Sequence, residues 1–215
     1  LSALINAARR LSDPRDPLGD AARAQLPSST GLSPENVELA LREVLETEPT
    51  ESEIRALIAS APPAPRVHVQ LAPNVFTAPL RAIALALAQS PSVFVRASRR
   101  EPVFARLLLQ ASAAFELVES LAPAPGDHLW AYGSDDTLSS LLRQLPAGVV
   151  LHAHGPGFGI ALIAAGASGA ASALASDLVP FDQRGCLSPR VAVVVAPADP
   201  ARRSARQVAL ELDRA

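Results

Sequence analysis

From Arg66 onward, short apolar runs alternate with longer segments of helical periodicity, and this alternation constrains the fold more than any other feature. The apolar runs occupy 67–71, 92–97, 127–132, 148–153 and 190–197, and the helical segments occupy 78–89, 101–121, 135–145 and 201–215. Alternating strands and helices need crossover connections, which are right-handed and cover both faces of a parallel sheet. The sequence therefore predicts an α/β protein with a parallel, Rossmann-like sheet and helices on both faces.

The first 65 residues have a different pattern, in which helices are separated by proline-rich breaks. Ser33 can cap a helix that opens with proline, and Thr50 with Glu53 has the spacing of a capping box. The segment APPAPR (61–66) contains three prolines and cannot continue a helix. We therefore predict an N-terminal helical segment over residues 1–65, ahead of the α/β region.

Polar residues and glycines follow the predicted strands where each strand ends. A doubly wound sheet binds its ligand beyond the carboxyl ends of its strands, so these residues predict a site without any motif. They are Asn74 after the first strand, Arg96 and Ser98 at the second, Gly133 and Ser134 after the third, and His152, His154 and Gly155 at the fourth. The usual dinucleotide fingerprint, G-x-G-x-x-G, is absent after the first strand, where the sequence reads APNVFTAP. The glycines of HGPGFG (154–159) lack its spacing and equally fit a turn between two strands.

Charge and cysteine content exclude several kinds of partner. With 19 basic and 21 acidic side chains and a net charge of −2, nothing in the charge favours nucleic acid or an anionic membrane. One cysteine excludes an internal disulfide and a cysteine-rich zinc site, and we expect no metal. The longest apolar run is mostly alanine and glycine and does not predict a membrane span. We expect a cytoplasmic protein and, because the sequence starts at Leu1 and has no methionine, further residues ahead of Leu1.

The only cysteine, Cys186, lies in the segment DQRGCLSP (182–189). Free cysteine often serves as a small buried hydrophobe, and that alternative is open for Cys186. Its neighbours favour a catalytic role instead. Gly185 permits close approach of the backbone to a ligand, and the charge of Arg184 favours a thiolate. A cysteine that takes an acyl group needs a donor for the developing oxyanion, and the Asn74 side-chain amide is a candidate.

Three segments together carry a resemblance to a known family. They are DQRGCLSP (182–189), APNVFTAPLRAIALALAQSPSVFVRASRREP (72–102) and YGSDDT (132–137). These segments resemble the acyl-CoA reductases typified by the fatty-acid reductase of bacterial bioluminescence, a branch of the aldehyde dehydrogenase superfamily. The resemblance extends over residues 33–200 and is most specific at the cysteine segment.

The resemblance implies a domain organisation. A nicotinamide cofactor-binding α/β domain, of the kind that lacks the glycine fingerprint, would occupy residues 66–180. Residues 181–215 would begin a catalytic domain that is truncated in this sequence, because the domain in the superfamily continues well beyond its cysteine.

The resemblance also implies roles for individual residues. Cys186 matches the nucleophile that takes the acyl group from a thioester, and Asn74 matches the amide of the oxyanion hole. Arg96 stands where relatives carry a lysine that contacts the adenosine ribose. Gly133 and Ser134 match a turn near the cofactor phosphates.

One departure from the superfamily bears on the reaction. Aldehyde dehydrogenases that hydrolyse their thioester carry a general-base glutamate in an ELGG segment, whereas HAHGPG (152–157) has no acid. This absence suits an intermediate that is reduced and not hydrolysed. His154 could act as the acid or base, with a structural role as the alternative. We expect His68, His128 and Trp130, which lie within predicted strands, to contribute to packing.

The turn after the second predicted strand suggests which nicotinamide is used. Arg96, Ser98, Arg99 and Arg100 lie where the adenosine ribose is expected, and the only acid, Glu101, comes last. Arginines can bind a ribose phosphate through paired hydrogen bonds. The sequence therefore predicts NADPH, with NADH open as the alternative and with solvent-facing arginines as the competing interpretation.

The leading hypothesis is a reductase that forms an acyl-enzyme at Cys186 from acyl-CoA or an acylated protein and releases a fatty aldehyde. A non-catalytic module that binds the cofactor or a partner subunit is the first alternative. A dehydrogenase that acts on free aldehydes is the second. A homo-oligomer is open in each case.

Overall fold

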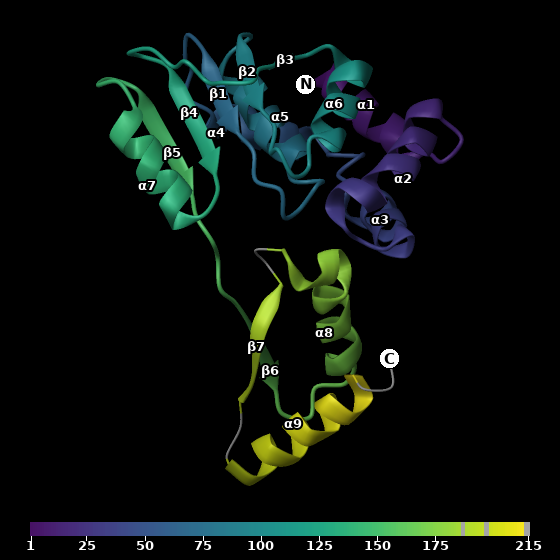
Figure 1. The fold of residues 1–215 in the computed structure, drawn as a ribbon. Coiled ribbons are helices and arrows are strands. Elements are labelled where there is room, and N and C mark those ends of the chain that lie inside the picture. The colour runs from purple at the N-terminus through teal and green to yellow at the C-terminus, as the bar shows by residue number, and fades with distance from the viewer. Residues whose placement is uncertain (186–187, 196–197, 213–215) are drawn as a thin grey trace. The chain divides into compact units, whose positions relative to one another are not determined.

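A computed structural model describes residues 1–185, 188–195 and 198–212. The chain forms two compact units, unit 1 (Leu1–Pro156) and unit 2 (Gly157–Ala215) (Figure 1). The domain boundaries predicted at residues 65 and 180 stay predictions.

Unit 1 begins with helices, as the proline-rich pattern predicts. They are α1 (Ser2–Ser12), α2 (Pro17–Thr30), α3 (Pro34–Leu39), a π-helical turn (Ala40–Val44) and α4 (Glu51–Ser60). Polar side chains fix where two of these helices start. Ser33 Oγ accepts a hydrogen bond from the Asn36 backbone N–H at 3.1 Å, and the predicted capping box of Thr50 and Glu53 is present at α4.

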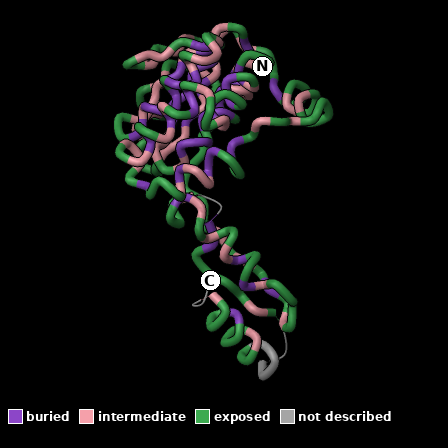
Figure 2. Tube along the Cα trace, turned by 90° about the vertical axis from the view of Figure 1, so that its right-hand side faces the viewer, coloured by how far each residue is buried: buried purple, intermediate pink, exposed green. Residues whose placement is uncertain are grey.

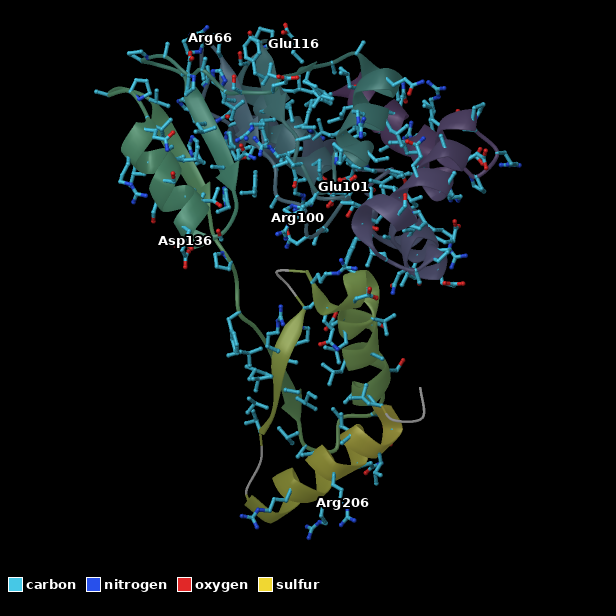
Figure 3. All side chains as sticks on the ribbon, viewed as in Figure 1. Arg66, Arg100, Glu101, Glu116, Asp136 and Arg206 are labelled. Carbon is cyan, nitrogen blue, oxygen red and sulfur yellow. The ribbon has the colours of Figure 1, made fainter. Side chains whose placement is uncertain are left out.

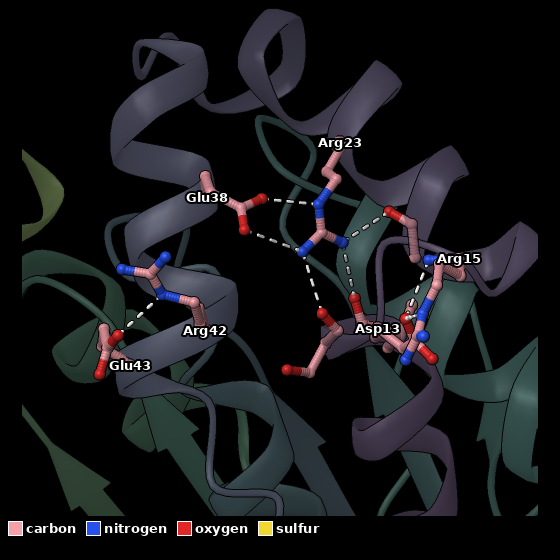
Figure 4. Close-up of polar contacts among 9 residues, drawn as sticks. Asp13, Arg15, Arg23, Glu38, Arg42 and Glu43 are labelled. Carbon is pink, nitrogen blue, oxygen red and sulfur yellow. Dashed lines mark hydrogen bonds and ion pairs between the residues drawn. The ribbon is translucent and has the colours of Figure 1, made fainter.

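Arg23 of α2 ties the first three helices together (Figure 4). Its guanidinium forms an ion pair with Glu38 of α3, with 2.6 Å between Nε and Oε2. It also donates to the carbonyl oxygens of Leu11 and Ser12 in α1, at 3.3 and 2.9 Å. The last carbonyls of a helix have no partner within the helix and carry its negative end, so a cation is favourable there.

The sheet of unit 1 has five parallel strands in the order β3-β2-β1-β4-β5. The strands are β1 (Val67–Gln70), β2 (Val93–Arg96), β3 (Glu116–Leu117), β4 (His128–Tyr132) and β5 (Val150–His154), and the helices between them are α5 (Pro79–Gln89), α6 (Val103–Ser112) and α7 (Asp135–Gln144). Right-handed crossovers place α5 and α6 on one face and α7 on the other, because the strand order runs in opposite directions from β1 and from β4. The predicted Rossmann-like fold is confirmed.

Buried residues of the central strands belong to the core of unit 1, whose buried residues Figure 2 shows in purple. Val67 pairs with Val93 and Val69 with Val95, so all four valines lie on one face of the sheet, and each is at most 3% exposed. α5 contacts both strands. Leu129 of β4 is also fully buried. β2 and β4 bury alternate side chains, as expected for strands, whereas all four residues of β1 are buried.

The prediction of one helix over 101–121 is wrong. α6 ends at Ser112, where Ala113 adopts a left-handed conformation with φ of 49°. The chain then buries Phe115 and forms β3, which pairs with β2. This pairing satisfies backbone groups at the edge of β2, which a continued helix would leave without sheet partners.

The amino edge of the sheet holds a buried polar cluster. The Asp127 carboxylate, 2% exposed, accepts a hydrogen bond from the Ala124 backbone N–H at 2.8 Å, and lies 3.0 Å from Arg66 Nη2 and 3.2 Å from His68 Nε2. Burial is the largest influence on Asp127 and favours its neutral form, but these hydrogen bonds and the Arg66 charge together hold its pKa below the usual value. Burial lowers the pKa of His68, and Asp127 opposes that effect. His68 also stacks on Phe94, with ring centroids 5.3 Å apart, in agreement with a packing role.

Unit 2 is a small α/β unit with two parallel strands. It contains β6 (Gly159–Ala164), α8 (Ala170–Leu178), a 3₁₀ turn (Pro180–Gln183), β7 (Pro189–Val195) and α9 (Ala198–Leu212). Its core consists of Ile163, Ala171, Leu174 and Val208. The predicted last strand and helix correspond to β7 and α9. The alanine- and glycine-rich run that precedes them, to which we assigned no element, forms β6 and α8.

One face of the sheet in unit 2 carries exposed apolar side chains. They alternate with the core residues along β6 and β7 and include Ile160, Leu162, Val191, Val193 and Val195. Within the described part of the chain, no helix has both the length and the apolar character that crossing a membrane requires.

Candidate functional site

The carboxyl edge of the sheet in unit 1 brings the predicted ligand-binding residues to one side of the molecule. Arg100 and Asp136 lie at this edge, and Arg66 and Glu116 lie at the opposite, amino edge (Figure 3). β1 lies next to β2 on one side and next to β4 on the other, so the strand order reverses direction between β1 and β4. Doubly wound sheets bind ligands outside the carboxyl ends of the strands at such a point.

Each predicted site residue of unit 1 follows or ends a strand at this edge. Asn74 is exposed in the loop between β1 and α5, and the others are Arg96, Ser98 and Arg99 after β2, Gly133 and Ser134 after β4, and His154 at the end of β5. The predicted nucleophile, Cys186, belongs to unit 2 and lies outside the described residues. The structure therefore groups the predicted oxyanion and cofactor residues but does not place the cysteine.

Arg96 is held in place by two hydrogen bonds. Its Nη1 donates to Oε1 of Gln70 in β1 at 2.9 Å, and its Nε donates to the backbone carbonyl of Glu119 at 3.1 Å. Gln70 is itself buried. Because a guanidinium has five N–H donors, these bonds orient Arg96 at the strand end and still leave donors for a ligand.

The turn after β2 separates its charges. The Ser98 hydroxyl accepts a hydrogen bond from the Arg100 backbone N–H at 3.2 Å, and Arg99 and Arg100 are exposed. Within the described residues neither arginine forms an ion pair. Glu101 is only 4% exposed, and its Oε1 accepts a hydrogen bond from the Phe104 backbone N–H at 3.0 Å. The turn therefore presents positive charge to solvent and keeps its carboxylate inside.

The turn between β4 and α7 is joined to the end of β5. The Gly133 backbone N–H donates to the His154 carbonyl at 3.2 Å. Ser134 caps α7, where its hydroxyl accepts from the Thr137 N–H at 3.4 Å. Asp135 and Asp136 follow in the first turn. These carboxylates interact favourably with the helix dipole. They also repel a phosphate, so it binds less favourably here than at a helix start without acidic residues.

His154 belongs to a stack of rings that the sequence analysis did not predict. Its ring stacks on Tyr132 with centroids 4.8 Å apart and lies 5.4 Å from Trp130, while Trp130 stacks on His152 at 4.0 Å. Burial, followed by the charges of neighbouring histidines, lowers the pKa of His152. The sequence shows rings at alternate positions in HLWAY and VLHAH, but the parallel register that pairs Trp130 with His152 is seen only in the structure.

Gln89 of α5 fixes the inner end of this stack. Its Oε1 accepts a hydrogen bond from Trp130 Nε1 at 2.6 Å, so its Nε2 faces His128 Nδ1 at 3.5 Å as a donor. His152 Nε2 lies 3.2 Å from the same Nδ1 atom. His128 Nδ1 is therefore placed to accept the Gln89 amide N–H. Trp130 and His128 serve packing and orientation, in agreement with the sequence-based expectation.

A cavity of about 630 Å³ lies elsewhere in unit 1 and contains none of the predicted site residues. Its lining comes mainly from α1, α4 and α5 and is largely apolar, with the Glu46–Arg81 ion pair among its residues. α4 buries no residue, so this space reflects the shallow packing of that helix. Among the described residues, no three histidine, cysteine, aspartate or glutamate side chains are grouped to hold a metal ion.

Comparison with known proteins finds a family to which part of the chain is similar. Residues 111–215 match the family described as acyl-CoA reductase (LuxC). No curated protein sequence matches the chain.

Solved structures share the fold across nearly the whole chain. An NAD-dependent benzaldehyde dehydrogenase from Corynebacterium glutamicum is 17% identical with a TM-score of 0.68, and the match covers 98% of this chain and 52% of that one. A propionaldehyde dehydrogenase from Rhodopseudomonas palustris with bound propionyl-CoA is 16% identical with a TM-score of 0.68, covering 99% and 53%. Lactaldehyde dehydrogenase from Escherichia coli is 15% identical with the same score, covering 99% and 50%.

The chain thus spans about half the length of these dehydrogenases. At such identities the likeness concerns the fold. The predicted resemblance is confirmed: this chain is similar to the acyl-CoA reductases over residues 111–215, and its fold is that of the aldehyde dehydrogenases.

Proposed function

We propose that the protein to which this chain belongs reduces an acyl thioester, from acyl-CoA or an acylated protein, to an aldehyde. The observation that carries the proposal is the acyl-CoA reductase match, which includes Cys186, Gly133, Ser134 and His154. The grouping of Asn74 with the last three residues at one sheet edge supports it.

The acyl group is transferred to Cys186. The thiolate attacks the carbonyl carbon of the thioester, and a bond forms between Sγ and that carbon. The bond between the carbonyl carbon and the carrier sulfur breaks, and the released carrier thiolate takes a proton. The Asn74 amide donates a hydrogen bond to the oxyanion that develops on the carbonyl oxygen. His154, exposed and held against Tyr132, supplies or removes the proton.

The carboxyl edge of unit 1 suits a nicotinamide dinucleotide. Arg96 ends β2, and Arg99 and Arg100 follow it, so all three offer positive charge at this edge. Gly133 would let the backbone approach the phosphates. Asp135 and Asp136 disfavour a phosphate at the start of α7. The arginines would therefore balance most of the negative charge of the cofactor phosphates. When bound, the nicotinamide supplies the hydride that reduces the acyl carbon. Release of the aldehyde then returns Cys186 to its thiolate.

We propose a preference for NADPH over NADH. Two arginines are exposed and unpaired among the described residues of the turn after β2, and guanidinium groups bind phosphate bidentately. A protein that selects NAD places a carboxylate near the ribose hydroxyls. Glu101, the only carboxylate in this turn, is buried and cannot take that role.

Incubating the full-length protein with a fatty acyl-CoA and NADPH tests the reductase. We expect thioester-dependent oxidation of NADPH and release of aldehyde. Mass spectrometry after treatment with the acyl thioester separates the enzyme from a non-catalytic module, since only the enzyme acquires one acyl group at Cys186. Turnover of free aldehyde to acid would favour a dehydrogenase instead.

Asn74→Ala tests the oxyanion contact. We expect a rate about a hundredfold lower with little change in thioester affinity, as is typical when one oxyanion donor is lost. Single-turnover acylation measured against thioester concentration separates the two quantities. An unchanged acylation rate would remove Asn74 from the site.

A further inference from the structure

Glu101 is a buried carboxylate between the exposed arginine turn and α6. It follows Arg99 and Arg100 directly, yet it is 4% exposed whereas both arginines face solvent. A buried carboxylate is costly unless it is hydrogen-bonded, so its inward position needs a compensating contact.

The compensating contact is with the start of α6. Glu101 Oε1 accepts a hydrogen bond from the Phe104 backbone N–H at 3.0 Å. The first N–H groups of a helix lack partners and form its positive end, where an anion is favourable. Pro102, at the N-cap position, has no side-chain acceptor, so Glu101 supplies the cap.

α6 in turn is fixed in the interior of unit 1. Phe104 is fully buried and packs edge-on against Phe76, with ring centroids 5.5 Å apart. α6 also contacts α1 and α2. The hydrogen bond from Phe104 therefore anchors the end of the turn to a rigid element, while Arg96 anchors its beginning to Gln70.

We propose that Glu101 is a positioning residue for cofactor selectivity, which holds the turn after β2 so that Arg99 and Arg100 point to the ribose phosphate of NADPH. The inference rests on the proposed function. In this proposal Glu101 has two effects. Its hydrogen bond to α6 fixes the backbone that carries the two arginines, and its inward position keeps the only carboxylate of the turn away from the ribose. Burial is the main cause of the raised pKa of Glu101, in agreement with the inward position.

Three variants of the full-length protein test this role. Glu101→Met removes both acceptor oxygens and retains side-chain bulk, and Glu101→Gln retains one acceptor for the Phe104 N–H. Thr50→Val removes the N-cap side chain of α4, far in the chain from the turn, and is the control for general loss of stability. The dissociation constants for NADPH and NADH are measured by calorimetry at one salt concentration.

We expect Glu101→Met to reduce the preference for NADPH about tenfold, mainly through weaker NADPH binding, since oriented charge-assisted hydrogen bonds to phosphate are lost. Glu101→Gln should stay close to the wild type, and Thr50→Val should lower the melting temperature without changing the preference.

Two results would overturn the proposal, and they are distinguishable. If the wild type prefers NADPH and Glu101→Met keeps that preference, Glu101 is only a helix cap and the proposed function stands. If the wild type binds neither dinucleotide, or binds both equally, the proposed NADPH function fails and the role of Glu101 fails with it.

Discussion

The two units use parallel strands differently. In unit 1 the central strands are covered, and Val69 and Val95 are completely buried. In unit 2 only one face of the β6–β7 pair packs on helices, and Leu162 on the other face is 74% exposed. Parallel strands are normally buried on both faces. Unit 1 therefore has the core to hold a site rigidly, whereas unit 2 carries its cysteine segment on a thinner scaffold.

Matched leucine truncations measure this contrast most strongly. We expect Leu129→Ala in β4 to lower the free energy of unfolding by about 3 kcal/mol, because it opens a cavity in a closed core. Leu162→Ala in β6 should change it by less than about 0.5 kcal/mol, as for other exposed positions. Urea denaturation of the 215-residue chain gives both values.

The control for this pair is Leu174→Ala, which truncates the small core of unit 2. Its effect should fall between the other two. Equal losses for Leu129→Ala and Leu162→Ala would mean that the apolar face of unit 2 is covered in solution, and the contrast between the units would be lost.

Asp127→Ala tests how much the buried polar cluster stabilises unit 1. Removing this carboxylate leaves the buried His68 and the half-exposed Arg66 without their partner. We expect the free energy of unfolding to fall by about 2 kcal/mol, less than for a fully buried ion pair, because water already reaches Arg66. Asp127→Asn should lose less, since it can still accept the Ala124 N–H. Thermal unfolding at pH 7 compares the two variants.

The same cluster predicts how stability depends on pH. The folded pKa of Asp127 is depressed, so its contribution is present above the unfolded value and is lost as pH falls through the folded one. The folded pKa of His68 is also lowered, so the unfolded chain takes up its proton first and stability falls as pH drops below about 6.5. Asp127→Asn should abolish the loss at the more acidic end. Stability that rises on acidification from pH 6.5 would contradict this account.

Gln89→Ala is expected to have a smaller effect. It removes the acceptor of the Trp130 indole N–H, and a lost hydrogen bond of this kind costs about 1 kcal/mol. Trp130 is the only tryptophan, so its emission should shift to longer wavelength as water reaches the indole. Unchanged emission and stability would show that the ring stack does not depend on Gln89.

The sequence predicted what periodicity controls and missed what tertiary packing controls. Strands β1, β2, β4 and β5 and the carboxyl-edge location of Asn74, Arg96 and His154 followed from the apolar runs and from the geometry of parallel sheets. The end of α6 at Ser112 was missed, because helical propensity continues beyond it and the chain leaves the helix to pair with β2. β6 and α8 were missed because alanine and glycine give little periodic contrast.

The inward turn of Glu101 could not be predicted either. In the sequence it is one more charged residue after Arg99 and Arg100, and its direction depends on where α6 packs. The ring stack on β4 and β5 depends on strand register, which is set by the whole sheet. The position of Cys186 lies outside the described residues, so its role stays a prediction.

We propose that unit 1 binds the cofactor and that Cys186 accepts the acyl group, and the Cys186→Ala variant separates these two functions. Full-length wild type and Cys186→Ala are each titrated with NADPH by calorimetry and then treated with a fatty acyl-CoA for mass spectrometry. The account predicts that Cys186→Ala binds NADPH within about twofold of the wild type, since additive effects are expected at separate sites, but acquires no acyl group. Loss of NADPH binding together with acylation, or acylation that persists in the variant, would contradict it.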